Sequence, residues 1–236
     1  MKPPLNLTTE LVPLTYVEAL LELAHTFGVE REALFAAARV KPQVLQHPNG
    51  RVSFLDFNLL AIAALQACHE PALGLLLGQR LNVSSHGILG YAVLASANLG
   101  QAIQFALKYY RVLGLTFDLE LIEHPERMEL RAIESMPMGP LTRFAAEGLL
   151  ASLYSIARFL VGVDLQGLTV GFAHAAPAYA ERYREIFGVA AQFDQPWHSL
   201  SMPKRYLAQP MALALSRIPI SEPPRPLYTS YAVFCF

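Results

Sequence analysis

The sequence predicts an α+β domain in which helices come first and a small, mostly antiparallel sheet with a β-hairpin and interspersed helices follows. Apolar residues recur with helical spacing through the first half of the chain and then alternate with polar residues in later stretches. No repeat period is visible. Helices followed by strands, rather than a regular alternation of the two, are typical of the α+β class.

The composition favours a well-packed protein with apolar surface to spare. The 236 residues are 53% hydrophobic and 16% charged, which provides for a core and for a pocket or an interface. The net charge of −1 lacks the basic excess of a nucleic-acid-binding domain. Two distant cysteines form no disulfide framework, and no apolar run reaches the length of a membrane span. We therefore expect a soluble, cytoplasmic protein without a membrane partner.

Prolines predict the boundaries of the domain. Residues 1–14 contain three prolines and no periodicity, so we expect an N-terminal arm. Residues 15–215 carry the periodic patterns and form the expected domain. Residues 216–236 contain a cluster of four prolines that is incompatible with a regular helix or a central strand, which predicts an irregular Pro-rich tail.

Capping residues predict the first helices. Thr15 and Glu18 have the spacing of a capping box, and this helix stops at Gly28. A second helix is expected at 31–39. The pair is no helix-turn-helix reader of DNA, because the second helix offers few side chains that could contact bases.

Two more helices are predicted before the central segment. Ser53 and Asp56 open a very apolar helix that ends near His69. Pro71 suits the first turn of the next helix, which runs to about Arg80.

The clearest helix follows residues 82–97. Asn98 and Gln101 form a capping box, and Gly114 is the expected stop. One face of this helix is apolar, which predicts that it packs on the core. That face consists of Leu99, Ala102, Ile103, Ala106, Tyr110 and Leu113.

The pattern then changes to strands. Apolar and polar residues alternate over 115–121 and again over 128–133, with a turn between them, which predicts a β-hairpin. A long helix is expected next, with Phe144, Ser152 and Phe159 among its core residues. This helix is expected at 141–161. It is followed by a strand at 168–174, a helix from 177 to 187, two short strands at 189–194 and 198–202 or one bent strand around Pro196, and a helical turn at 203–208.

Enzyme chemistry and metal binding find little support. No nucleophile-elbow, P-loop or zincin motif occurs, and Ser84-Ser85-His86 is adjacent in sequence only, whereas triads are assembled by the fold. The seven histidines are scattered, and no Cys/His or acidic cluster has metal-ligand spacing. We expect no enzyme, no metal and no cofactor.

Three motifs together resemble a known family. They are His86-Gly87 through Gly90-Tyr91-Ala92, then Ser96 through Ile103, then Lys108-Tyr109-Tyr110-Arg111. Phe187-Gly188, Phe193-Asp194-Gln195-Pro196 and Leu200 through Pro203 follow in the same order. Over residues 10–215 the chain resembles the N-terminal effector-sensing domain of AraC-type bacterial transcription regulators. The subfamily is the largely helical one, not the cupin barrel of the arabinose regulator itself.

The resemblance implies a sensor that works by binding and not by chemistry. A small-molecule effector, with an apolar part and a carboxylate, would shift how a DNA-binding domain is presented. A homodimer is implied, and DNA contact would come only through a C-terminal helix-turn-helix domain, which we expect to be absent from this chain. The alternatives are an interaction module that binds no ligand and a small hydrolase or isomerase.

Aromatic residues near the central helix are the candidate ligand contacts, because a sensing pocket needs an apolar lining with a few polar groups. His86 precedes the Gly87 helix start, and two arginines offer bidentate contacts to a carboxylate. For each residue, packing or surface solvation is the competing interpretation. The candidates are His86, Tyr91, Phe105, Tyr109, Tyr110, Arg111, Phe117, Arg143 and Trp197.

Overall fold

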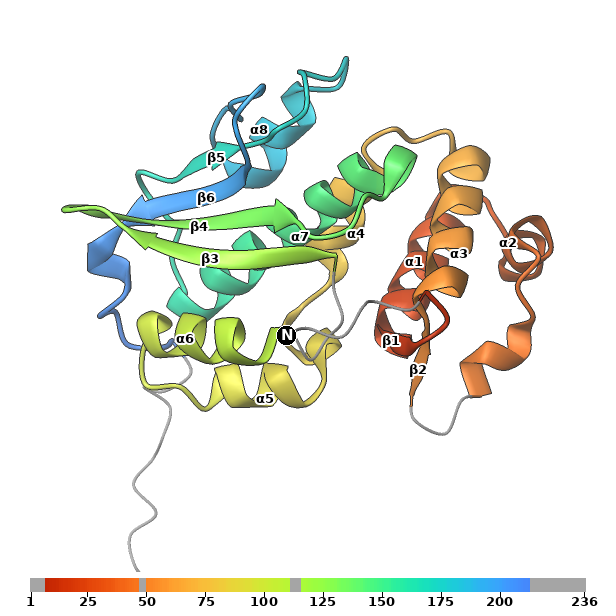
Figure 1. The fold of residues 1–236 in the computed structure, drawn as a ribbon, viewed down its shortest axis with the longest axis horizontal. Helices are drawn as coiled ribbons and strands as arrows, with labels where there is room; N and C mark the ends of the chain where they lie inside the picture. The colour runs from red at the N-terminus through yellow and green to blue at the C-terminus, as the bar shows by residue number, and fades with distance from the viewer. Residues whose placement is uncertain (1–6, 47–49, 111–115, 213–236) are drawn as a thin grey trace, which may run out of the picture.

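The N-terminal helices and the later sheet lie at opposite ends of the molecule, with helices α4 (Leu73–Arg80) and α7 (Thr142–Val161) between them (Figure 1). The computed structural model describes residues 7–46, 50–110 and 116–212. The predicted Gly114 helix stop and the Pro-rich tail lie outside these residues. The predicted α+β class is confirmed.

In the described residues, the N-terminal unit consists of three α-helices, one 3₁₀ helix and a two-stranded sheet. Its elements are β1 (Glu10–Pro13), α1 (Leu14–Thr26), α2 (Arg31–Ala38), the 3₁₀ helix Pro42–Gln46, β2 (Arg51–Ser53) and α3 (Phe54–Cys68). Strands β1 and β2 pair antiparallel. The arm predicted at 1–14 therefore contains a strand, which its proline content and short length concealed.

One predicted cap in this unit is confirmed and one is wrong. Ser53 caps α3, because its Oγ accepts from the Asp56 backbone N–H at 3.0 Å. Thr15 does not cap α1, which begins at Leu14. The Thr15 hydroxyl instead donates to the Ser85 carbonyl at 2.6 Å, a contact that ties α1 to a segment far along the chain.

The central segment folds as a 3₁₀ turn and two helices. These are Val83–His86, α5 (Ile88–Leu94) and α6 (Leu99–Tyr110). Gly87 has φ +60° and starts α5, a conformation that favours glycine. The predicted cap of α6 is confirmed, since the Gln101 N–H donates to Asn98 Oδ1 at 2.9 Å.

The main sheet is antiparallel throughout, in the order β3-β4-β6-β5. Its strands are β3 (Phe117–Glu123), β4 (Arg127–Glu134), β5 (Thr169–Gly171) and β6 (His198–Pro203). The predicted hairpin is confirmed as β3–β4. The strand predicted at 189–194 is wrong, because this segment contributes only an isolated bridge between Gln192 and Gly171.

The core helix α7 lies under the sheet (Figure 1). Phe144 and Ser152 are buried as predicted, but Phe159 is 53% exposed. The stretch Gly139–Val161 is long and apolar enough to cross a membrane, yet more than half of its most apolar window is buried in the fold. This burial matches the core helix of a globular domain.

The final elements close the sheet end of the molecule. They are α8 (Glu181–Phe187) and the 3₁₀ helix Lys204–Tyr206, which confirms the predicted helical turn. The 3₁₀ helix Gly139–Leu141 instead precedes α7 and contacts α3 of the N-terminal unit.

Two large hydrophobic cores and one small cluster, around Phe117, Ala132 and Ala146, form among the described residues. The N-terminal core contains Leu20 and Leu34, and the sheet-side core contains Leu150 and Phe172. Helix α4 contributes to both, since Leu73 and Leu77 belong to the first core and Leu75 to the second.

Candidate ligand cavity

An apolar cavity of about 190 Å³ lies on the inner side of the sheet, among α5, α6 and α7, and reaches α1 and α3. The residues of α6 that line the cavity include those of its predicted apolar face, from Leu99 to Tyr110. The apolar lining includes Phe54, Leu89, Val93, Leu99, Ala102, Ile103, Ala106, Phe117, Met128, Leu149, Leu153, Ala157, Leu160, Leu200 and Met202.

The lining contains few polar groups. They are Tyr16, Asn58, His86, Tyr110, Thr116 and Ser152. Among the described residues, no Asp, Glu, Lys or Arg lines the cavity. The site therefore offers hydrogen bonds but no compensating charge.

Three of these polar groups form a chain of hydrogen bonds with one direction. Ser152 Oγ donates to the Leu81 carbonyl at 3.1 Å, so its lone pair accepts from His86 Nε2–H at 3.3 Å. His86 Nδ1 then accepts from the Tyr16 hydroxyl at 2.6 Å. Burial lowers the pKa of His86 to about 4, so the imidazole is neutral near pH 7. A neutral ring is what this series of hydrogen bonds requires, because Nδ1 accepts while Nε2 donates.

Local geometry holds His86 at this place. The Ser85 N–H donates to Asn82 Oδ1 at 3.2 Å, which caps the 3₁₀ turn that ends at His86. Gly90 lies against this turn so closely that a Cβ there would be 1.8 Å from the Val83 carbonyl oxygen. Only glycine permits this approach of α5.

Tyr110, at the end of α6, differs from the other polar groups. Its hydroxyl is buried and has no hydrogen-bond partner in the described part of the chain. Burial raises the pKa of Tyr110 well above its ordinary value, and the nearby Tyr16 and Asp118 raise it further. Since an unpaired buried hydroxyl costs about 1–3 kcal/mol, it marks a place where a partner is missing.

The structure brings three of the nine candidate residues to the cavity, namely His86, Tyr110 and Phe117. Tyr91 is 66% exposed on α5, and Tyr109 is exposed on α6, where it stacks on Phe105. Tyr91, Phe105 and Tyr109 do not line the cavity. Arg111 lies outside the described residues.

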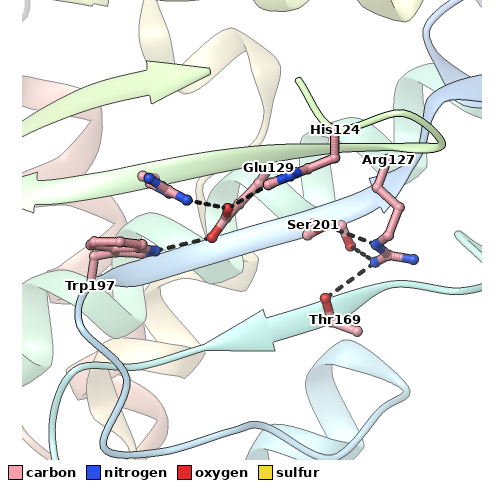
Figure 2. Close-up of polar contacts among 7 residues, drawn as sticks. His124, Arg127, Glu129, Thr169, Trp197 and Ser201 are labelled. Atoms are coloured by element: carbon pink, nitrogen blue, oxygen red, sulfur yellow. Dashed lines mark hydrogen bonds and ion pairs between the residues drawn. The ribbon is translucent and has the colours of Figure 1, made fainter. Parts of the chain in front are cut away.

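Trp197 belongs to a polar cluster on the other face of the sheet (Figure 2). Its indole N–H donates to Glu129 at 3.0 Å, and the Arg131 guanidinium lies 3.8 Å from its ring centroid. Burial alone would raise the pKa of Glu129, but hydrogen bonds from Arg131, Trp197 and His124 lower it to about 2. Glu129 is thus held by three side chains of the cluster, none of which lines the cavity.

A second group of hydrogen bonds on this face joins residues of three strands. Arg127 donates to Ser201 Oγ at 3.1 Å and to Thr169 Oγ1 at 3.2 Å, which links β4, β6 and β5 (Figure 2). These contacts stabilise the sheet.

Arg143 is exposed on the first turn of α7 and does not line the cavity. A hydrogen bond with Tyr179 raises the pKa of Arg143 against the opposing effect of burial, and the charge of Glu147 raises it further. Arg143 therefore acts at the contact between α7 and the α8 region.

Sequence reasoning missed Tyr16, Asn58, Thr116 and Ser152 as site residues. The sequence did contain a signal for Ser152, because a hydroxyl on the core-facing side of a helix needs a hydrogen-bond partner. Tyr16 and Asn58 carried no such signal, since α1 and α3 reach the cavity only through the tertiary fold.

Comparison with known proteins identifies the family. Residues 28–211 match the N-terminal arabinose-binding domain of AraC transcription regulators. The chain belongs to this family. It is a regulatory ligand-binding domain and not an enzyme, as the sequence predicted.

Individual relatives agree with this assignment. An ornithine utilization regulator of Pseudomonas aeruginosa is 68% identical over 214 residues, which cover 91% of this chain and 63% of that protein. Uncharacterized HTH-type regulators of Mycobacterium bovis and Mycobacterium tuberculosis are 26% identical over 113 residues, covering 47% of this chain and 33% of theirs. The chain thus spans less than two thirds of the length of these relatives.

The fold of the AraC-type domain is also found in a solved structure. The transcriptional regulator CdpR from Pseudomonas aeruginosa matches with a TM-score of 0.57 and 17% identity, over 81% of this chain and 56% of that chain. At this identity the likeness concerns the fold alone.

Proposed function

We propose that this domain encloses a small-molecule effector in the cavity and passes the binding event to a helix-turn-helix domain of an AraC-type regulator in the cytoplasm. The observation that carries the proposal is the cavity itself, apolar along its walls and polar where α1 meets the 3₁₀ turn. Ligand sites commonly combine an apolar lining with a few placed polar groups. An engineered apolar cavity of about 150 Å³ already binds benzene, so about 190 Å³ accommodates a larger molecule.

Binding would act through a shift between conformations. The lining draws on both ends of the molecule, with Tyr16 from the N-terminal unit and Met202 from the sheet. A ligand that fits one arrangement of these parts better than another raises the population of the arrangement that it fits. The size of this shift is set by the difference between the two affinities.

The relative's name makes ornithine utilisation the starting point for an effector screen. A carboxylate bound in the cavity, as the sequence led us to expect, finds no arginine or lysine in the described lining. The lining therefore supports the apolar part of the expected effector better than its carboxylate.

The test is to fill the cavity. Ala102 is 2% exposed on α6 and lines the cavity, so Ala102→Leu places three more carbon atoms inside it. A molecule that copurifies in native mass spectrometry, or that raises the melting temperature in a metabolite screen, should lose binding in this variant. Gln104→Leu adds a similar side chain on the exposed face of α6 and should keep binding. Equal binding by both variants would exclude the cavity as the site.

Self-association is a second candidate function, alone or beside ligand binding. Ile88 is 89% exposed and Tyr91 66% exposed, one turn apart on α5. Apolar side chains exposed together favour an interface, and we propose that they contribute to a homodimer. Light scattering should show a dimer that Ile88→Glu weakens and Val163→Glu, at an exposed site elsewhere, does not. A monomer at all concentrations would refute the dimer.

A further inference from the structure

We propose that the cavity takes an uncharged amphiphile, whose hydroxyl or amide head group pairs with Tyr110 and Tyr16 and whose apolar tail runs along α7. The proposal rests on the proposed function, because it assigns a ligand class to the same cavity. It goes further in naming the head-group contacts, the direction of the tail and the absence of charge.

The tail direction follows from how the lining is distributed. Lining residues recur on one side of α7 from Phe144 to Leu160, which corresponds to about 24 Å at 1.5 Å per residue. The end near Leu160 and Met202 is entirely apolar in the described lining. An extended chain of carbon atoms suits a space that is long and contains no hydrogen-bonding groups at one end.

The head-group position follows from the hydrogen bonds already in place. Because the Tyr16 hydroxyl donates its proton to His86, its oxygen keeps a lone pair that can accept. The Tyr110 hydroxyl is buried and has no hydrogen-bond partner among the described residues, so its proton can be donated to a ligand. The two tyrosines are close enough to influence each other electrostatically.

A hydroxyl or a primary amide satisfies both tyrosines at once. Its oxygen accepts from Tyr110, and its O–H or N–H donates to Tyr16. A ketone would satisfy Tyr110 alone, and an alkane would leave both unsatisfied.

A charged head group fits less well. Moving an ion out of water without a paired countercharge costs far more than moving a neutral amide or hydroxyl. The described lining supplies no countercharge, and the electrostatic effect of Asp118 on Tyr110 would oppose a carboxylate at this place. L-ornithine, which is charged at both ends, is the least suited.

The test uses five probes that differ in charge. Dissociation constants of the full chain are measured by calorimetry at pH 7.5 for 1-octanol, octanamide, octanoate, octylammonium and L-ornithine. We expect octanol and octanamide to bind at least tenfold more tightly than the three charged probes. Tyr110→Phe should weaken octanol and octanamide about tenfold, since it removes one hydrogen bond. Tyr109→Phe, on the neighbouring exposed ring, should change nothing.

The outcomes separate the two proposals. Tightest binding by octanoate, octylammonium or ornithine that Ala102→Leu abolishes would overturn the uncharged head group and leave the cavity as the effector site. Equal affinity of octanol for the wild type and Tyr110→Phe would overturn the tyrosine contacts. No binding by any of the five would overturn the ligand class, whereas the proposed function fails only if the metabolite screen and native mass spectrometry are also empty.

Discussion

Glu147 is a carboxyl group of α7 that is almost fully buried. Its Oε1 accepts hydrogen bonds from the hydroxyls of Tyr179 and Tyr183, which attach the α8 region to the core helix. Burial raises the pKa of Glu147 to about 7, although the two tyrosines, Arg143 and the Leu75 backbone act in the opposite direction. The carboxyl group is therefore partly protonated near neutral pH.

This shift makes stability depend on pH. Between about pH 4.5 and 7 the folded protein keeps a proton that the unfolded chain has released, so stability falls as pH rises through this range. At 1.36 kcal/mol per pKa unit, the loss is on the order of 3 kcal/mol. Glu147→Gln keeps the oxygen that faces the tyrosines but cannot ionise, so it should remove this slope.

Urea denaturation of both proteins from pH 5 to 8 checks the prediction. The difference between the two curves isolates Glu147 from His86 and His198, whose pKa values burial lowers and whose contribution falls as pH decreases. Parallel curves across this range would contradict a raised pKa for Glu147.

At the scale of elements, the contact between α4 and α7 depends on glycines. A Cβ at Gly78 would lie 2.4 Å from the Gly148 carbonyl oxygen and 2.7 Å from Ala151 Cβ, so the helices would have to separate. Gly78→Ala should lower the free energy of unfolding by about 1–3 kcal/mol, as overpacking does.

Gly148, on the facing helix, provides a matched control. A Cβ there meets only the Gly74 carbonyl oxygen, at an ordinary 3.4 Å. Gly148→Ala should be neutral or stabilise by up to about 1 kcal/mol through helix propensity. Equal destabilisation of the two variants in urea titrations would mean that the glycines act through flexibility and not through close packing.

The elements that the sequence predicted well are those with long patterns or reciprocal caps. The α6 cap at Asn98 and the β3–β4 alternation extend over enough residues to be unambiguous. The missed strands β1 and β2 have four and three residues, too few for alternation to show, and they form by pairing across the chain.

The site was harder to predict, for reasons of helix geometry. Tyr109 and Tyr110 are adjacent, but consecutive residues of a helix point about 100° apart, so one is exposed and the other lines the cavity. The Tyr16–His86 contact joins residues that no local pattern connects. The sequence could nominate aromatic residues but could not choose among them.

At the scale of the whole molecule, the two ends of the fold are joined by shared helices. Phe144 of α7 belongs to the N-terminal core and Leu150, less than two turns later, to the sheet-side core. The Thr15–Ser85 and Tyr16–His86 hydrogen bonds connect the same two parts. A disturbance in one core should therefore reach the other.

Leu20→Ala tests this coupling. Leu20 is fully buried in the N-terminal core, so its truncation should cost about 2–5 kcal/mol. The only tryptophan, Trp197, contacts Glu129 and Arg131 on the sheet, so its fluorescence reports the other end. Coupled cores predict that the urea midpoints from fluorescence and from far-UV circular dichroism fall together. Leu55→Ala, at an exposed site of α3, should shift neither. An early circular dichroism phase with an unchanged fluorescence midpoint would mean that the N-terminal unit unfolds alone, and a ligand spanning both parts would then have to hold them together.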